Sequence, residues 1–156
     1  MASFALNHGF ETGDLSPWIG QNASVTSGNA HQGMFKAVLE GDGKNSFIYQ
    51  WVPAIAGEIG EMFVSLAKSD SRPSPYVTAT IQYYSPAFEF LGYGAIDLID
   101  IDSLPHADLH RWKTLYTYSS SLPTNTKWAL VVLNALPLSG SSDVYLDTTI
   151  IKFNYA

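Results

Sequence analysis

The sequence lacks cysteine, and this absence excludes a disulfide framework, a thiolate nucleophile and any zinc site built on cysteine. Charged residues are scarce. They make up 14% of the 156 residues, against roughly 25% in an average soluble domain. This low charge excludes intrinsic disorder and argues against a long solvated helix or coiled coil. Eight Lys and Arg against 14 Asp and Glu leave a net charge of −6. A chain of this sign repels phosphate backbones, so a nucleic-acid partner is not expected.

Long apolar runs are absent as well. No stretch approaches the roughly 18 residues that a membrane-spanning helix needs, so no membrane span is expected. Residues 1–14 have neither a basic start nor a long apolar segment, and they predict no Sec signal peptide.

What the sequence does contain favours β structure. Apolar residues make up 46% and aromatics 13%, and 12 Gly and 8 Pro supply turns. Short apolar or alternating runs recur between these turn residues, and no helical periodicity is sustained. The segment Ile99–Arg111, which contains Pro105, has room for one short helical turn. The predicted strands are Ser3–Leu6, Ala23–Ser27, Met34–Glu40, Ser46–Val52, Met62–Lys68, Tyr76–Ser85, Phe88–Ile99, Trp112–Ser120, Lys127–Ala135 and Val144–Phe153.

This many short strands predicts an all-β fold, a two-sheet antiparallel β-sandwich. Neither an internal repeat nor a linker is visible, so residues 1–156 are expected to form a single domain. Asp42-Gly43 predicts a hairpin between the strands on either side, because both positions tolerate a positive φ.

Strand alternation predicts which side chains share a face. Within residues 76–84, the apolar set suits the core: Val77, Ala79 and Ile81. The opposite set is Thr78, Thr80, Gln82 and Tyr84, and in the strand 46–52 the aromatic set is Phe47, Tyr49 and Trp51. If the outward sets share one sheet, its face is aromatic and polar.

The strand Lys127–Ala135 is apolar on both faces, which predicts cover on both sides by the fold or by a partner.

The stretch NHGFETGDLSPW, residues 7–18, resembles the start of bacterial β-jelly rolls, the carbohydrate-binding modules of the galactose-binding-like type. Residues 27–33 with the following KAVL, FIYQWVP at 47–53, Trp112 and VYLD at 144–147 are similar to later segments of that family. The resemblance covers nearly the whole chain and implies jelly-roll topology.

A narrower resemblance points to a particular subgroup. FETGDLSPWIG, VSLAKSDSRPSP and ALVVLNALPLSGSSDVYLD look like the amino-terminal head of collagen-repeat surface proteins of spore-forming bacteria. The chain itself has no Gly-X-Y tract, so it would be the head alone or a stand-alone relative. This resemblance implies an extracellular, spore-surface or cell-surface location. Spore-surface proteins made in the mother cell need no signal peptide.

The jelly-roll resemblance also implies a structural Ca²⁺ that ties the first loop to the last strand. The matching ligands are backbone carbonyls at Gly9, Gln32 and Phe35 and the carboxylates of Glu11 and Asp147, and oxygen ligands of this kind suit Ca²⁺. Thr148 stands where the family has a second Asp, which leaves fewer carboxylates. The alternative is that Glu11 caps turn amides and Asp147 bonds a loop backbone.

A sugar platform is the second candidate site, formed by Tyr49, Trp51, Gln82 and Tyr84. Pyranose rings stack their C–H faces on aromatic rings, and amide groups bond sugar hydroxyls. The alternative is that these aromatics belong to the core or to an oligomer interface. Trp18 and Trp112 are expected in the core.

Two further clusters suggest chemistry less strongly. His106, Asp108 and His110 would share one face in a strand and could then hold a metal, but the flanking Pro105 favours a solvated loop. Asp97, Asp100 and Asp102 offer carboxylates, yet no catalytic motif accompanies them. Asp100 and Asp102 are more simply charges that deter strand-edge pairing.

Together these features predict a non-catalytic, surface-displayed binding or adhesion module with a glycan or polysaccharide as ligand. The alternative is a self-assembling structural subunit or oligomeric head of a spore or cell-surface layer or fibre, with further copies of the chain as partners.

Overall fold

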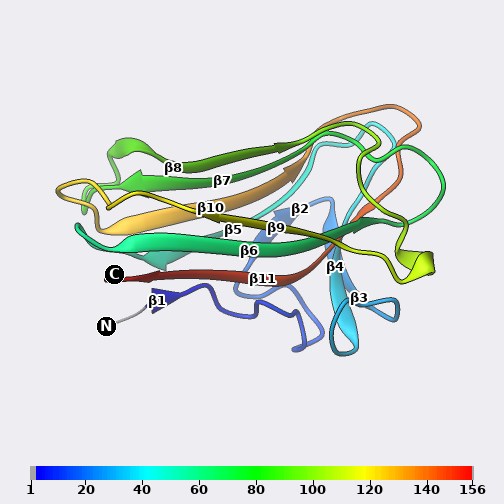
Figure 1. Ribbon diagram of the computed structural model, residues 1–156, viewed down its shortest axis with the longest axis horizontal. Coiled ribbons are helices and arrows are strands. Elements are labelled where there is room, and N and C mark those ends of the chain that lie inside the picture. The colour runs from blue at the N-terminus through cyan, green and yellow to red at the C-terminus, as the bar shows by residue number, and fades with distance from the viewer. Residues whose placement is uncertain (1–2, 156) are drawn as a thin grey trace.

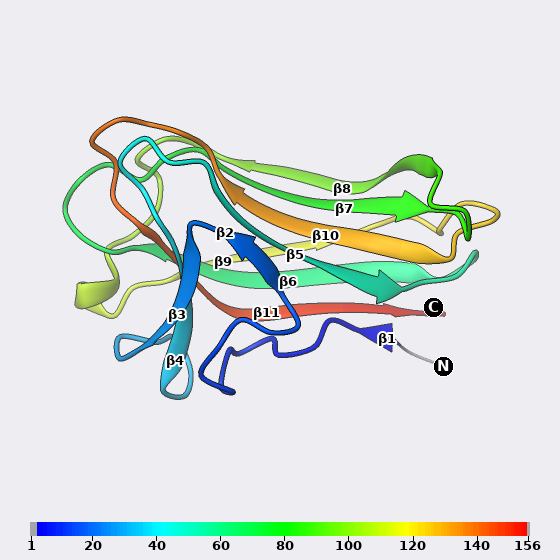
Figure 2. The ribbon, with the colours of Figure 1, turned by 180° about the vertical axis from the view of Figure 1, so that it is seen from behind.

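The computed structural model describes residues 3–155 and shows two β-sheets packed face to face (Figures 1 and 2). A single 3-10 turn, η1 (Ala107–Leu109), lies in the segment where one helical turn was expected. No helix in this part of the chain is long and apolar enough to cross a membrane. The strands are β1 (Ser3–Phe4), β2 (Ile19–Gln21), β3 (Ala23–Ser27), β4 (Phe35–Leu39), β5 (Ser46–Pro53), β6 (Ile59–Lys68), β7 (Val77–Tyr84), β8 (Phe90–Ile99), β9 (Lys113–Tyr118), β10 (Trp128–Ala135) and β11 (Val144–Asn154).

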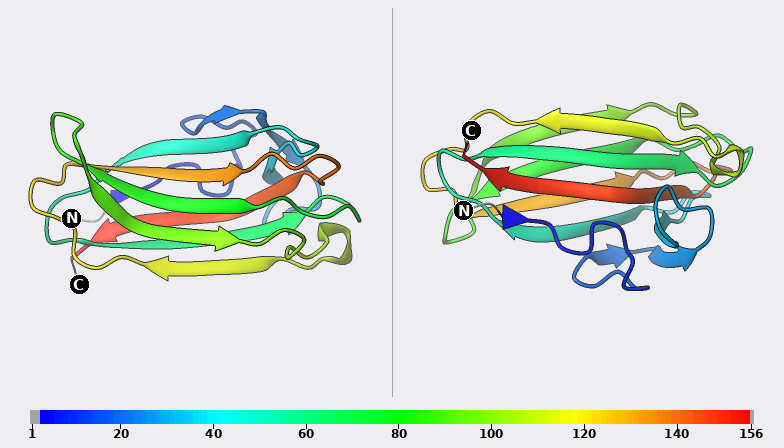
Figure 3. Two further views of the ribbon diagram at one scale, coloured as in Figure 1. Left: turned by 90° about the horizontal axis from the view of Figure 1, so that it is seen from above. Right: turned by 60° about the horizontal axis from the view of Figure 1, so that its bottom comes forward.

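The first sheet has the strand order β3-β4-β11-β6-β9, with β1 paired to β11, and we call it sheet A. The second has the order β2-β5-β10-β7-β8, and we call it sheet B. Neighbouring strands are antiparallel in both. The first and last described residues lie at the same end of the sandwich, where β1 pairs with the end of β11 (Figure 3). The predicted two-sheet antiparallel sandwich is confirmed.

The turn predicted at Asp42-Gly43 is present, but the prediction that the strands on either side of it pair as a hairpin is wrong. Both residues have a positive φ, 56° and 86°. However, β4 belongs to sheet A and β5 to sheet B, so the turn carries the chain from one sheet to the other. Turn residues specify a local reversal of the backbone, and packing of the sheets decides which strands then pair. The short strand β2 was not predicted, because its three residues are exposed and show no alternation.

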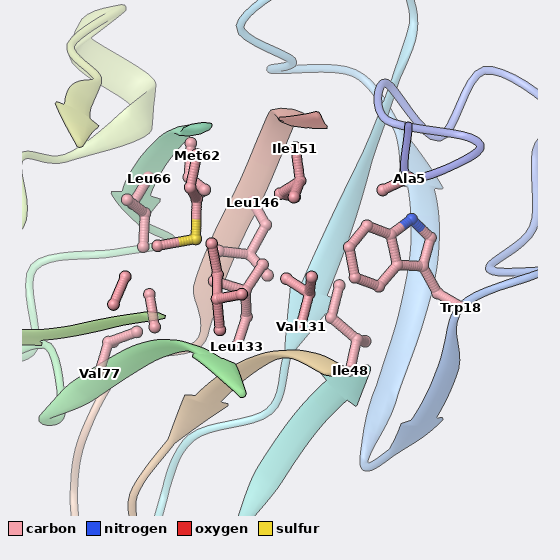
Figure 4. Close-up of a cluster of buried hydrophobic side chains, with 14 of the residues drawn as sticks. Ala5, Trp18, Ile48, Met62, Leu66, Val77, Val131, Leu133, Leu146 and Ile151 are labelled. Carbon is pink, nitrogen blue, oxygen red and sulfur yellow. The ribbon is translucent and has the colours of Figure 1, made fainter. Parts of the chain in front are cut away.

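The core lies between the sheets and is filled by every second residue of the long strands (Figure 4). In β7 the predicted inward residues Val77, Ala79 and Ile81 are fully buried. Trp18 is also in the core, as expected, with 3% of its surface exposed. Trp112 is not, since it lies half-buried against His31, with ring centroids 5.6 Å apart.

The fold covers only one face of β10. Its residues alternate strictly between buried and half-buried, because the strand sits in the middle of sheet B with one face on the core. Its outward side chains receive partial cover from neighbouring strands. The two-sided cover expected for this strand is therefore not supplied by the fold.

Tyr83 links the two sheets through a buried hydrogen bond. Its ring lies in the core, and its hydroxyl donates to Ser119 Oγ at 2.8 Å, just beyond β9 of sheet A. Ser119 Oγ also accepts from the Gly60 amide at 3.0 Å. Gly94 is required beside this ring, since a Cβ there would lie 2.3 Å from the Tyr83 hydroxyl.

We expect Tyr83→Phe to lower the free energy of unfolding by about 1 kcal/mol, because it removes one buried hydrogen bond without removing the ring. Urea unfolding measures the change. The matched control is Tyr93→Phe, whose ring is 55% exposed and whose substitution should leave stability unchanged. Equal stability of the two variants would contradict the role assigned to Tyr83.

Candidate functional site

The outward face of sheet B carries aromatic and amide side chains in rows that cross the strands. Trp51, Leu130 and Gln82 are register partners in one row, and Tyr49, Val132 and Thr80 form the next. A third row contains Phe47, Asn134 and Thr78. The four residues of the predicted sugar platform, Tyr49, Trp51, Gln82 and Tyr84, therefore lie on one face, as the alternation predicted.

Aromatic rings form a continuous cluster at one end of this face. The Trp51 ring lies edge-on to Tyr84, with centroids 5.0 Å apart, and to Phe88 at 5.4 Å. Phe88 is also nearly parallel to Trp128, at 6.0 Å. The left-handed backbone of Phe88, with φ of 60°, belongs to the β7–β8 hairpin, so this turn places a ring against β5 and β10. Phe90 continues the cluster beside Tyr84 at 5.7 Å.

A hollow of about 470 Å³ lies next to this cluster, over β5 and β10. Two of the predicted platform residues, Tyr49 and Trp51, line it, whereas Gln82 and Tyr84 stand one strand further away on β7. The full lining is Asn45, Phe47, Tyr49, Trp51, Leu130, Val132 and Asn134.

Sequence reasoning missed Trp128 and Asn134 as residues of this face. Strand alternation could have found them, because both lie on the same face of β10 as Leu130. The residues of the other face are all small or aliphatic, whereas this face carries an indole and an amide. Phe88 could not have been found this way, since it lies in a turn where alternation does not apply.

The polar groups of the hollow are held in place by hydrogen bonds. The Asn134 amide donates to Asn45 Oδ1 at 2.8 Å and to the Ser46 carbonyl at 2.9 Å. Beside the hollow, the Tyr84 hydroxyl donates to Gln82 Oε1 at 3.0 Å. The lining contains no charged side chain, so the hollow suits a neutral ligand with a flat apolar surface and hydroxyl groups.

The predicted calcium ligands Glu11 and Asp147 both hold the turn at residues 32–35. The two Glu11 oxygens accept from the amides of Met34 and Phe35, each at 2.8 Å. Asp147 is fully buried and accepts from the amides of Gln32 at 2.9 Å and Thr148 at 2.8 Å. Burial raises the pKa of Asp147, and these amides oppose that rise.

The arrangement matches the alternative in which the two carboxylates bond turn and loop amides. The amides of Gln32 and Phe35 face the carboxylates, and Gly9 lies beside Glu11, where a Cβ would be 3.6 Å from Glu11 Cγ. Within residues 3–155 no group of three or more His, Asp or Glu side chains gathers to hold a metal. The predicted calcium site takes most of its ligands from backbone carbonyls, which are not counted among such side chains, and the ion remains a prediction.

The histidine cluster does not form a shared face. His106 caps the 3-10 turn, its Nδ1 accepting from the Asp108 amide at 3.1 Å, and Asp108 accepts from Asn29 at 2.8 Å. Residues two apart share a face when they belong to a strand. This segment is a 3-10 turn, so the three side chains do not share a strand face.

Asp97 and Asp102, two of the three carboxylates considered for catalysis, have separate surroundings. Asp97 is opposite the buried Ala79 and points toward the interior at the edge of sheet B, where burial raises its pKa. Asp102 instead pairs with Lys68 at 3.2 Å on the surface.

No profile of a known protein family matches the chain, and no curated protein matches it. Solved structures do resemble it. A family 16 carbohydrate-binding module is 17% identical with a TM-score of 0.71, and the match covers 94% of this chain and 96% of that one. The module TmCBM61, solved with β-1,4-galactotriose, is 18% identical with a TM-score of 0.65 over 94% and 95%.

The same fold also occurs in an enzyme. The Stig cyclase Fisc from Fischerella sp. TAU, solved with an indole compound, is 16% identical with a TM-score of 0.70, and the match covers the whole of both chains. At such low identities the comparisons show the fold alone. The chain therefore has the β-sandwich fold of the carbohydrate-binding modules.

If calcium binds, we expect CaCl₂ to raise the thermal unfolding midpoint of the wild type above its value in EDTA, because a ligand that binds only the folded state stabilises it. Glu11→Gln should abolish this response. In EDTA it should also lower the free energy of unfolding by about 0.5–1.5 kcal/mol, since the amide replaces one of two acceptor oxygens of exposed hydrogen bonds. Glu89→Gln is the control. A wild type indifferent to CaCl₂ would contradict calcium binding at this place.

Proposed function

We propose that the protein is a non-catalytic carbohydrate-binding module whose ligand lies in the hollow over β5 and β10. The observation that carries the proposal is the charge-free lining, in which the rings of Phe47, Tyr49 and Trp51 stand beside the amides of Asn45 and Asn134. Aromatic rings offer a flat π face to the C–H face of a pyranose, and amides both donate to and accept from hydroxyls.

The dimensions of the hollow favour an oligosaccharide over a single sugar. From Asn45 to Trp51 the strand advances six residues, or ~20 Å at about 3.4 Å per residue. The aromatic cluster around Phe88 stands at one end of this path and the two asparagines at the other. A chain of sugar units lying along β5 would contact rings at every second residue.

The solved relatives support this choice of ligand class. Two of them are carbohydrate-binding modules, and one of these holds a galactotriose. The cyclase shows that the same sandwich also serves catalysis. The neutral aromatic hollow favours binding over catalysis here, because no carboxylate, histidine, lysine or arginine side chain lines it.

Surface display follows as part of the same proposal. A shallow open site of this kind binds each glycan weakly, and presentation of many copies on a cell or spore surface would raise the overall affinity. We therefore propose an extracellular or surface location and a role in adhesion.

A second candidate function is self-assembly into a surface layer or fibre. β8 is an edge strand of sheet B, and its outward side chains Phe90, Tyr93, Ile96 and Leu98 are 52–67% exposed. Contiguous apolar side chains on a sheet edge are typical of a surface that another chain covers.

We expect neutral polysaccharides such as β-1,4-galactan or xylan to retard the wild type in affinity electrophoresis and Trp51→Ala to lose this retardation. The substitution removes the ring shared by the hollow and the aromatic cluster. Tyr155→Ala is the control, because Tyr155 is exposed and lies outside the hollow. Retardation of Trp51→Ala equal to that of the wild type, or none for the wild type on any polysaccharide of the set, would contradict the proposal.

If the chain self-assembles through β8, sedimentation at rising concentration should show a trimer, a higher oligomer or a filament. Leu98→Lys should restore the monomer, since it places a charge on the exposed strand edge. Lys113→Glu, on the edge of the other sheet, is the control. A wild type that stays monomeric at high concentration would exclude this function.

A further inference from the structure

The outward face of sheet A carries a second group of aromatic and polar side chains, on the opposite side of the sandwich from the hollow. Ile150, Phe63 and Tyr116 are register partners across β11, β6 and β9. The next row contains Lys152, Glu61 and Tyr118. Five of these six side chains, all except Tyr118, surround a small depression of about 210 Å³.

A β-bulge in β11 makes these rows possible. Pairing with β6 shifts register between Asp147 and Ile150, and Thr148 within the bulge has a left-handed backbone, with φ of 49°. Tyr145 and Asp147 lie on the outward side before the bulge, where the turn at residues 32–35 covers Asp147. Ile150 and Lys152 lie on this side after the bulge. The extra residue therefore turns Ile150 toward Phe63 and places Lys152 opposite Glu61, as bulges beside functional sites do.

The polar groups of the depression are arranged around one carboxylate. Glu61 accepts from the Tyr116 hydroxyl at 2.8 Å and pairs with Lys152 Nζ at 3.2 Å. These two donors hold the pKa of Glu61 below its usual range. The rings beside it remain open: Tyr116 is 54% exposed and Phe63 36%.

We propose that this depression is a second carbohydrate-binding site, which takes a single neutral pyranoside. The ring face of Tyr116 stacks on the sugar, Glu61 accepts from one hydroxyl, and Lys152 donates to a neighbouring one. The charges of Glu61 and Lys152 cancel, so the site favours a neutral ligand, and its volume suits one sugar ring. The ligand class of this second site rests on the proposed function, but its residues are different from those of the hollow.

A module with sites on both sheet faces is bivalent. The two sheets lie back to back (Figure 3). The hollow is on the outward face of sheet B and the depression on the outward face of sheet A, so they open in opposite directions. One copy of the chain would then join two glycan chains, which adds avidity at a dense surface.

The test is a titration of ¹⁵N-labelled protein, followed by amide chemical shifts, with methyl β-D-galactopyranoside, methyl β-D-glucopyranoside and methyl β-D-xylopyranoside. We expect saturable shifts at residues 61–63, 115–118 and 150–152 with at least one glycoside. Tyr116→Ala should weaken binding at these residues by roughly tenfold, and Tyr116→Phe, which keeps the ring, by less. Tyr155→Ala is the control for an exposed tyrosine elsewhere, and Trp51→Ala should leave these shifts unchanged.

Each outcome separates the two proposals. Shifts confined to residues 45–51 and 128–134 would overturn the second site and leave the proposed function intact. Shifts only at the sheet A residues would support the second site. They would leave the hollow, which favours a longer sugar chain, to the electrophoresis with polysaccharides. No shift with any of the three glycosides up to high millimolar concentration would overturn the second site. The proposed function would then still be decided by the retardation of the wild type on polysaccharides.

Discussion

Each sheet buries one face against the other, and the direction of every outward side chain depends on this packing. Side chains alternate along a strand, so burial of Val131 and Leu133 in the core places Leu130 and Val132 outside. Register then aligns the outward residues of neighbouring strands into rows. A slip of one residue would exchange the two sets, and the energetic cost of exposing the core is what holds the aromatic face in place.

The two outward faces have different chemistry on the same scaffold. On sheet B the side chains around the hollow are aromatic, aliphatic or amide, without charge. On sheet A an ion pair of Glu61 and Lys152 stands beside Phe63 and Tyr116. Both sites suit neutral ligands rich in hydroxyl groups. The hollow on sheet B offers aromatic rings along the length of β5, whereas the depression on sheet A offers a paired donor and acceptor. A sandwich with two solvent-facing sheets allows this because neither face is needed for the core.

The sequence predicted correctly those features that a local residue pattern specifies. It did not predict features that depend on the pairing of segments far apart in the chain. The inward set of β7 and the shared face of Trp51 and Tyr84 followed from alternation alone. The turn at Asp42-Gly43 was located, but its strands pair in different sheets. The contacts of Glu11 with the amides of Met34 and Phe35 join segments more than 20 residues apart, and no local pattern distinguishes this role from calcium binding.

By itself, the sequence determined where the strands other than β2 lie, which of their side chains share a face, and that they form a two-sheet sandwich. These properties depend on backbone geometry and on the burial of apolar side chains within short segments. Only the tertiary structure decided that Phe88 lies against Trp51 and Trp128, and that a bulge turns Lys152 toward Glu61. Such contacts arise from register between strands far apart in the chain, and register is set when the two sheets pack together.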